Sequence, residues 1–186
     1  MSTTADLLRF TTSDYQRIAE LGLFENRGRV ELIDGSIRLM SPIGPSHWAA
    51  VSRLSRLLFE LTKLNAIISI QSTIQLNQYN SPEPDVAIVK FRDDFYQARL
   101  PGPIDILLLI EISDTSLDFD LGPKKELYAA SGIKEYWVVD LINRQIIQFS
   151  DPVGNDYSIK QIINQSASVQ SKQLPELQIA ASQLFV

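Results

Sequence analysis

The sequence contains no cysteine, which excludes disulfide bonds and thiolate metal sites. It contains one histidine, His47, so typical zinc sites would lack ligands, and any metal site must use oxygen and nitrogen donors. The P-loop, the glycine-rich dinucleotide fingerprint and the G-x-S-x-G nucleophile turn are also missing. Nucleotide-binding and serine-hydrolase functions therefore lack their usual signatures.

Long hydrophobic runs are missing as well. The longest strongly apolar run, residues 104–112, is far shorter than the roughly 20 residues that a membrane span needs. That run also contains Asp105 and Glu111. Residues 1–10 are polar and mixed and lack the apolar core of a secretory signal. We therefore expect a cytoplasmic protein that makes no contact with a membrane.

Basic residues are fewer than acidic ones. The chain carries 17 basic and 22 acidic residues, a net charge of -5. This balance argues against avid, non-specific binding to nucleic acid, which usually needs a basic surface. It remains compatible with an enzyme that has a locally positive groove. The 186 residues, 45% of them apolar, predict one domain with a full hydrophobic core.

Hydrophobic periodicity and turn residues predict the helices. Helices are expected over residues 12–21, 46–64 and 121–131. Thr12 or Ser13 can cap the first helix and Ser46 the second, and Pro123 suits the first turn of the third.

The strands follow from turn signals and apolar runs. Asp34-Gly35 between two alternating segments, residues 29–34 and 36–40, is a strong hairpin signal. Further strands are expected over residues 66–71, 73–76, 85–89, 104–112, 136–140 and 145–149. An irregular or helical segment is expected at 91–100, and a strand, a loop and a short strand or turn over 157–186. The predicted fold class is α/β (α+β), with a central mixed β-sheet flanked by helices.

Two acidic residues stand at the edges of apolar strands. Glu111 lies in the run 104–112, where an ionised carboxylate is costly unless something pairs with it. Asp85 begins another apolar strand, directly after Pro84. Adjacent strands lie about 4.8 Å apart, so both carboxylates could share one cation, and such ligands suit Mg²⁺ or Mn²⁺. The alternatives are a strand-end carboxylate in water for Glu111 and an ordinary Pro-Asp turn for Asp85.

Two lysines and a third acidic residue extend this pattern. Lys124 and Lys125 follow Glu111 near the start of the expected helix, where positive charges oppose the macrodipole. Stability therefore does not explain them, and one of them could bind a phosphate or polarise water; simple solvent exposure is the alternative. Glu31 is either a further site residue or the polar partner in an alternating strand.

Four other polar residues have less specific positions. His47 stands at the start of the second expected helix, where a local hydrogen bond or a role at a phosphate would both fit. Asp34 fits the hairpin turn. Asp114 and Asp118 follow Glu111 closely, and helix capping explains them better than metal binding.

Several short segments carry a resemblance to a known family. They occur in the order Glu31-Leu-Ile-Asp-Gly35, Met40-Ser-Pro with Gly-Pro-Ser-His47, Pro84-Asp85-Val, Ile110-Glu111-Ile-Ser, Lys124-x-x-x-Tyr128-Ala-x-x-Gly132-Ile and Glu135-Tyr-Trp-Val-Val-Asp140. The ordered set resembles the Uma-two family of restriction-type endonucleases, which is abundant in cyanobacteria and belongs to the PD-(D/E)xK nuclease superfamily.

The resemblance implies a restriction-endonuclease-like core and a metal-dependent endonuclease that hydrolyses phosphodiester bonds in DNA. Asp85 and Glu111 would be the two motif acids and would hold Mg²⁺ or Mn²⁺ with the carbonyl of Ile112. The superfamily lysine normally follows the second acid by two residues, a position that Ser113 occupies here. The resemblance then favours Lys124, on the following helix, in the lysine's role.

The same resemblance makes Glu31 the additional acid that many such nucleases carry on an early element. Because duplex DNA has two strands and the fold has one site, double-strand cutting favours a homodimer. Trp48 and Tyr79 could pack at a dimer interface, whereas Trp137 fits the core. Two other functions stay open: a catalytically silent nucleic-acid-binding or interaction module on the same fold, and a metal-dependent hydrolase of small phosphodiesters.

Overall fold

A six-stranded mixed sheet forms the centre of the protein, in a computed structural model that describes residues 7–61 and 65–185. In spatial order the strands are β3 (Ala66–Ile70), β4 (Val86–Lys90), β5 (Ile106–Ser113), β6 (Glu135–Asp140), β7 (Gln145–Val153) and β8 (Asp156–Asn164). Neighbouring strands are antiparallel except β5 and β6, which are parallel. The predicted α+β class with a central mixed sheet is therefore confirmed.

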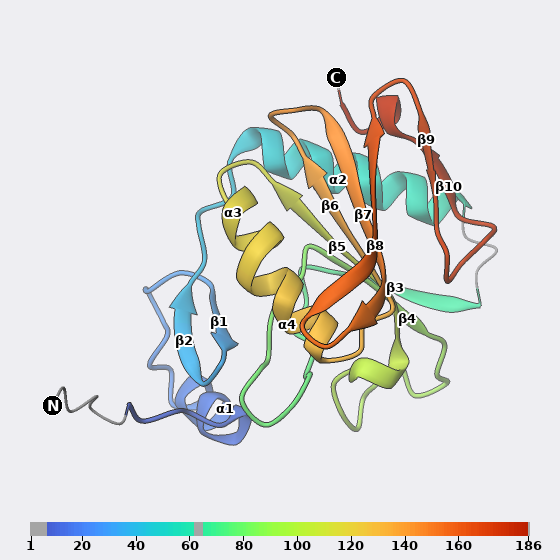
Figure 1. The fold of residues 1–186 in the computed structure, drawn as a ribbon. Coiled ribbons are helices and arrows are strands. Elements are labelled where there is room, and N and C mark those ends of the chain that lie inside the picture. The colour runs from blue at the N-terminus through green and yellow to red at the C-terminus, as the bar shows by residue number, and fades with distance from the viewer. Residues whose placement is uncertain (1–6, 62–64, 186) are drawn as a thin grey trace, which may run out of the picture.

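Helices α2 (Pro45–Leu61) and α4 (Lys125–Ala130) cover opposite faces of the sheet (Figure 1). The short helix α3 (Leu117–Phe119) precedes α4, with a π-helical turn at Asp120–Lys124 between them, and α1 (Thr12–Glu20) lies beside the N-terminal hairpin. Short 3-10 turns occur at Pro103–Asp105 and Ala181–Gln183. Because side chains alternate along a strand, Val86 and Ile110 pack against α2, whereas Ala87 and Leu109 pack on the side of α4. Trp137 is fully buried in the α2 layer, as predicted.

Two small sheets lie outside the central one. The hairpin of β1 (Val30–Ile33) and β2 (Ser36–Leu39) was predicted correctly, and β9 (Ser168–Gln170) pairs with β10 (Gln178–Ala180) near the C-terminal end. Both residues of the hairpin turn have positive φ, 50° at Asp34 and 72° at Gly35. A Cβ at Gly35 would lie 2.6 Å from Cβ of Arg9, so this close approach requires glycine.

The helix boundaries differ from the predicted ones in detail. Thr11, rather than Thr12 or Ser13, caps α1, and its hydroxyl accepts a hydrogen bond from the backbone N–H of Asp14. Helix α2 begins at Pro45, so Ser46 lies within its first turn and is not its cap. The predicted end of α2 near residue 64 lies outside the described residues. Across 7–61 and 65–185, no helix is long and apolar enough to cross a membrane.

Two strand predictions were wrong. Residues 73–76 form no strand, because the backbone N–H of Ile74 donates to the carbonyl of Pro82 at 3.0 Å within the same loop. That donor is therefore not available for a sheet ladder. The strand expected over 104–112 begins only at Ile106, because the residues before it form a 3-10 turn.

The helix expected over residues 121–131 begins earlier and is irregular. Helix α3 starts at Leu117, and the π-helical turn joins it to α4. Pro123 therefore lies inside the helical segment and not in its first turn, which corrects the prediction. Proline has no N–H to donate, and the wider π-helical turn accommodates it. As a result Lys124 lies well inside the segment, so the argument from a helix N-terminus does not apply.

Candidate active site

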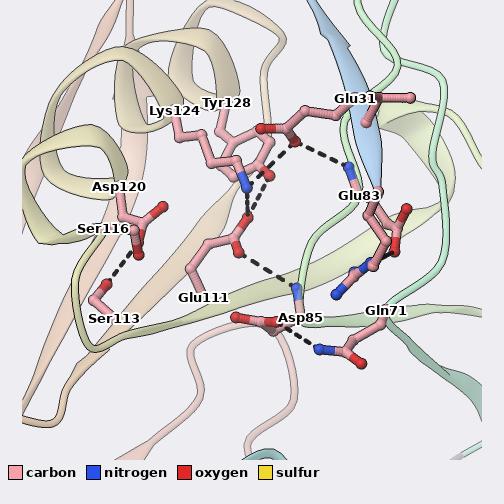
Figure 2. Close-up of polar contacts among 12 residues, drawn as sticks. Glu31, Gln71, Glu83, Asp85, Glu111, Ser113, Ser116, Asp120, Lys124 and Tyr128 are labelled. Atoms are coloured by element: carbon pink, nitrogen blue, oxygen red, sulfur yellow. Dashed lines mark hydrogen bonds and ion pairs between the residues drawn. The ribbon is translucent and has the colours of Figure 1, made fainter. Parts of the chain in front are cut away.

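The two predicted metal ligands meet where β5 ends and β4 begins. Asp85 directly precedes Val86, which pairs with Ile110, so Asp85 lies opposite Glu111 on the neighbouring strand. Both residues are buried, with 7% and 3% of their surfaces exposed. Figure 2 shows the Glu111 side chain beside the backbone of Asp85 and close to Lys124. Strand pairing thus brings together two acidic residues that are 26 residues apart.

Asp85 is held by three hydrogen-bond donors. Its Oδ2 accepts from the backbone N–H of Ile112 and from Nε2 of His47, both at 2.9 Å, and its Oδ1 accepts from Gln71 at 3.2 Å. Burial acts to raise the pKa of Asp85, but the contacts with His47, Ile112 and Gln71 outweigh it and leave the pKa below its ordinary value. The carboxylate of Asp85 is therefore ionised at neutral pH.

His47 does not serve the local hydrogen bond that its sequence position suggested. From the first turn of α2 it reaches Asp85, 38 residues away. Burial lowers the pKa of His47, but the hydrogen bond to Asp85 and the charges of Asp85 and Asp114 raise it above its ordinary value. The imidazole and the carboxylate therefore hold each other in position.

Glu111 lies against a buried amine and a phenol. Its Oε1 accepts hydrogen bonds from Nζ of Lys124 at 2.9 Å and from the hydroxyl of Tyr128 at 2.7 Å. Its Oε2 is 3.4 Å from the backbone N–H of Asp85. Burial raises the pKa of Glu111 to about 8, against the lowering effect of Lys124 and with the charges of Asp120 and Asp85 adding to the rise. Glu111 therefore ionises readily only when further positive charge lies beside it.

Lys124, and not Lys125, faces this cluster. Its Nζ lies 2.9 Å from Glu111 and 3.5 Å from Oε2 of Glu31, and the residue is only 4% exposed. Burial alone would lower the pKa of Lys124, but the charges of Glu111 and Glu31 keep it above the usual range. Lys125 instead forms an ion pair with Asp156 of β8, at 2.8 Å. The π-helical turn therefore determines which of the two lysines points toward Glu111.

The remaining acidic candidates separate into two groups. Glu31 is buried at the cluster, where it also accepts a hydrogen bond from the backbone N–H of Glu83 at 3.3 Å. Asp34 lies in the hairpin turn, as predicted. Helix capping by Asp114 or Asp118 was wrong, because Ser116 occupies the N-cap position of α3. Asp114 lines the cleft beside the cluster, and Asp118 lies in the first turn of α3.

Sequence reasoning missed several residues of the site, among them Asp120 and Tyr128. Asp120 is buried and accepts hydrogen bonds from the hydroxyls of Ser113 and Ser116, at 2.7 and 2.5 Å. Burial, as the largest influence, raises the pKa of Asp120. Asp120, Lys124 and Tyr128 follow one another at intervals of four residues, the spacing that places side chains on one helix face. That stripe was the signal available in the sequence.

A cleft of about 350 Å³ is lined by most of these charged groups, whereas Tyr128 lies buried behind Glu111 and does not line it. Its acidic side chains are Glu31, Asp85, Glu111, Asp114 and Asp120, and its basic side chains are Arg29, Arg38, His47 and Lys124. Arg29 forms an ion pair with Glu83. Among the described residues Arg38 has no ion pair with a carboxylate, and its guanidinium lies 4.1 Å from the ring centroid of Phe119. Arg38 therefore has N–H groups available to an anion at the mouth of the cleft.

The donors in this cleft fit a divalent cation in kind. No group of three or more His, Asp and Glu side chains within 7–61 and 65–185 could hold a metal ion. The protein's own ligands would then be Asp85, Glu111 and a backbone carbonyl, with water and substrate completing the shell, as is common for Mg²⁺. The carbonyl of Ile112 suits this role, because it points to the same side of β5 as the N–H that binds Asp85.

Comparison with known proteins identifies similar sequences and folds. The family described as "Uma2: Putative restriction endonuclease" matches residues 12–182. Among solved structures, the chain is similar to the crystal structure of a "putative nuclease belonging to DUF820" from Anabaena variabilis ATCC 29413. The TM-score is 0.73 at 16% identity, over 95% of this chain and 97% of that one, a likeness that concerns the fold alone. No curated protein matches the sequence.

Proposed function

The chain belongs to the Uma2 family, described as putative restriction endonucleases, and from this premise we propose that it is a metal-dependent endonuclease that hydrolyses phosphodiester bonds in DNA. The observation that supports this most directly is the convergence of Asp85, Glu111 and Lys124 in one cleft. These residues come from two strands and a helical segment, and ionisable groups with shifted pKa values that share a cleft are characteristic of functional sites.

Asp85, Glu111 and the carbonyl of Ile112 would hold Mg²⁺ or Mn²⁺. A cation held there would supply a water of lowered pKa and would neutralise charge on the scissile phosphate. His47 and Gln71 keep the carboxylate of Asp85 oriented toward the end of β5. Hydrogen bonds of this supporting kind fix the geometry of metal-binding carboxylates.

Lys124 would act as a fixed positive charge. Because its neighbours hold its pKa above the usual range, it keeps its proton and is no general base. Its ammonium group instead donates hydrogen bonds to the attacking water or to a phosphate oxygen in the transition state. Glu31 and Tyr128 position Lys124 and Glu111.

A protein with a net charge of -5 needs local positive charge to bind DNA, and Arg38 can supply it. The guanidinium of Arg38, held over the ring of Phe119, would bind a backbone phosphate at the mouth of the cleft. Because the cleft has one set of these groups, we propose that a homodimer cuts both strands of a duplex.

Plasmid cleavage tests the proposal. The purified protein should nick or cut plasmid DNA with Mg²⁺ or Mn²⁺ and lose the activity in EDTA. Asp85→Asn, Glu111→Gln and Lys124→Met should each reduce the cleavage rate by about 100-fold or more. Lys125→Gln is the matched control, since Lys125 pairs with Asp156 away from the cleft, and it should cleave normally.

Two outcomes would overturn the proposal. DNA binding without cleavage in the presence of any divalent metal would favour a catalytically silent module. That function also fits the structure, because protein groups already donate hydrogen bonds to both carboxylate oxygens of Asp85. Turnover of a chromogenic phosphodiester without affinity for duplex DNA would favour a small-molecule hydrolase, which the net charge of -5 suits.

A further inference from the structure

A second cavity, of about 230 Å³, lies next to the cleft. The first turns of α2 separate the two, because His47 lines the cleft and its neighbour Ser46 lines the second cavity. Ala49 and Arg53 follow Ser46 at helical spacing and line the same cavity. One short stretch of helix therefore faces both cavities.

Two arginines make the second cavity positive. Arg53 and Arg144 line it, and none of the described residues that line it is acidic. Arg53 donates to the carbonyl of Leu184 at a long 3.4 Å, and Nε of Arg144 donates to Gln165 at 2.9 Å. Neither arginine has an ion pair with a carboxylate in the part of the chain that the structure describes. Nη2 of Arg53 and both terminal nitrogens of Arg144 are therefore available to an anion.

The turn between β6 and β7 holds Arg144 in place. The carboxylate of Asp140 accepts hydrogen bonds from the backbone N–H and side chain of Asn143 and from the side chain of Gln145, at 2.7 to 3.0 Å. Arg144 itself has a left-handed backbone, with φ of 53°. A turn fixed in this way loses little freedom when the guanidinium binds a ligand.

The size and charge of the cavity select a small anionic group. Its volume lies below the range of about 300–1,000 Å³ that is usual for whole small-molecule ligands. Two guanidinium groups match a phosphate, whose oxygens accept the paired N–H donors of arginine. A nucleic-acid strand that enters the neighbouring cleft carries further phosphates beside the scissile one.

Resting on the proposed function, we infer that this cavity binds a backbone phosphate of the substrate strand while a neighbouring phosphodiester occupies the active-site cleft. Arg53 and Arg144 would contact that phosphate, and the first turns of α2 would fix the spacing between the two positions. The contact carries no base specificity, because phosphate contacts position a strand without reading its sequence.

The test uses a double variant that carries both Arg53→Gln and Arg144→Gln. Its control is a second double variant that removes two positive charges elsewhere. The control pair is Arg56→Gln with Lys134→Gln; both residues are exposed and neither lines the cavity. A labelled oligonucleotide duplex is titrated in EDTA at several salt concentrations. The double variant should bind about tenfold more weakly at low salt, with a salt slope lower by about one. Equal affinity of the double variant and the control would overturn the inference.

Two further measurements separate the remaining outcomes. Inorganic phosphate, followed by NMR, should shift the amides of Ser46 and Ala49 in the wild type and in the control, but not in the double variant. Phosphate binding without any change in DNA affinity would mark a site for the free anion and overturn the strand assignment. Arg53→Lys with Arg144→Lys keeps the charge and should retain part of the DNA affinity, which keeps the test valid if the glutamine variant fails to fold.

The outcome for the proposed function is read separately. Mg²⁺-dependent plasmid cleavage by the wild type reports on the endonuclease, whereas oligonucleotide binding in EDTA reports on the cavity. A protein that binds DNA through Arg53 and Arg144 but never cuts it would overturn the proposed function and leave the cavity as a contact for a DNA phosphate.

Discussion

The charge on Glu111 depends on the groups around it. Its carboxylate is almost fully buried, and Lys124 and Tyr128 both donate to the same oxygen. Asp85 and Asp120 add negative charge nearby, which opposes ionisation of Glu111. A buried carboxylate in such surroundings either takes up a proton or pairs with a cation.

We predict that Glu111→Gln alters the pH dependence of stability in EDTA. The pKa of Glu111 is about 8 in the folded protein, against 4.5 ordinarily, so the folded state holds this proton more tightly than the unfolded chain does. Its contribution to the free energy of unfolding is therefore full at low pH and is lost as pH rises between these two values. The variant should lack this decline.

Denaturant unfolding at about pH 5, 7 and 9 measures the difference. Glu126→Gln, on the exposed side of α4, serves as the control and should keep the wild-type pH dependence. Identical slopes in wild type and Glu111→Gln would show that burial does not govern the ionisation of Glu111.

His47 should act as a positioning residue through its hydrogen bond to Asp85. His47→Ala should reduce cleavage by about 10- to 100-fold and weaken Mn²⁺ binding to a similar extent, as is usual when a ligand loses its supporting partner. His47→Gln, whose amide can donate from nearly the position of Nε2, should recover much of both. An alanine variant with wild-type Mn²⁺ affinity would contradict this role.

At the scale of elements, each one contributes a particular part of the site. The antiparallel pairing of β4 and β5 sets Asp85 opposite Glu111. Strand β6 pairs with β5 on its other side, so β5 is an interior strand of the sheet. The π-helical turn aligns Asp120, Lys124 and Tyr128 toward that end. Helix α2 brings His47 from the opposite face of the sheet. Small changes of register in any of these elements would disperse the cluster.

Strand β6 also anchors the C-terminal segment through another buried carboxylate, that of Glu135. Glu135 is fully buried, and it accepts hydrogen bonds from the side chains of Trp137, Gln148 and Ser171 and from the backbone N–H groups of Lys172 and Gln173. Removing this acceptor leaves several buried donors without a partner, and each such loss is costly.

We therefore predict that Glu135→Ala lowers the free energy of unfolding by about 3 kcal/mol or more. Glu176→Ala removes the same charge from an exposed position in the segment that Glu135 anchors, and it should change stability by no more than about 0.5 kcal/mol. Chemical denaturation of both variants provides the measurement. A small effect at Glu135 would mean that other contacts hold the segment.

At the scale of the whole molecule, the net charge is -5, and the acidic residues of the cleft are part of it. Both favour the binding of a cation. A cation that binds the folded state and not the unfolded chain stabilises the fold by mass action. At a metal concentration about 100 times Kd the gain is about 2.7 kcal/mol. For a protein of this size that corresponds to a rise in Tm of roughly 5–10 °C.

We predict such a rise in Tm when Mn²⁺ is added to the metal-free protein. Asp85→Asn and Glu111→Gln should abolish it, whereas Lys125→Gln should retain it. Differential scanning calorimetry across a Mn²⁺ titration measures the shift without any need for a substrate. A Tm that does not respond to millimolar Mn²⁺, or that responds equally in the ligand variants, would contradict a metal site at Asp85 and Glu111.

Local patterns in the sequence were sufficient for most of the fold. The hairpin at Asp34-Gly35, the apolar face of α2 and the buried run of β5 each depend on neighbouring residues, and all three were predicted. The segment 73–76 and the helical segment around Pro123 were not, because loop hydrogen bonds and a π-helical turn depend on contacts that periodicity does not record.

The sequence by itself determined which residue types were available: acids at the edges of two apolar strands, two adjacent lysines and a single histidine. Only the tertiary structure decided that Lys124 faces Glu111 while Lys125 faces Asp156, and that His47 reaches Asp85. The physical reason is that these contacts join segments 13 to 38 residues apart, so strand register and helix rotation set them, and local sequence does not.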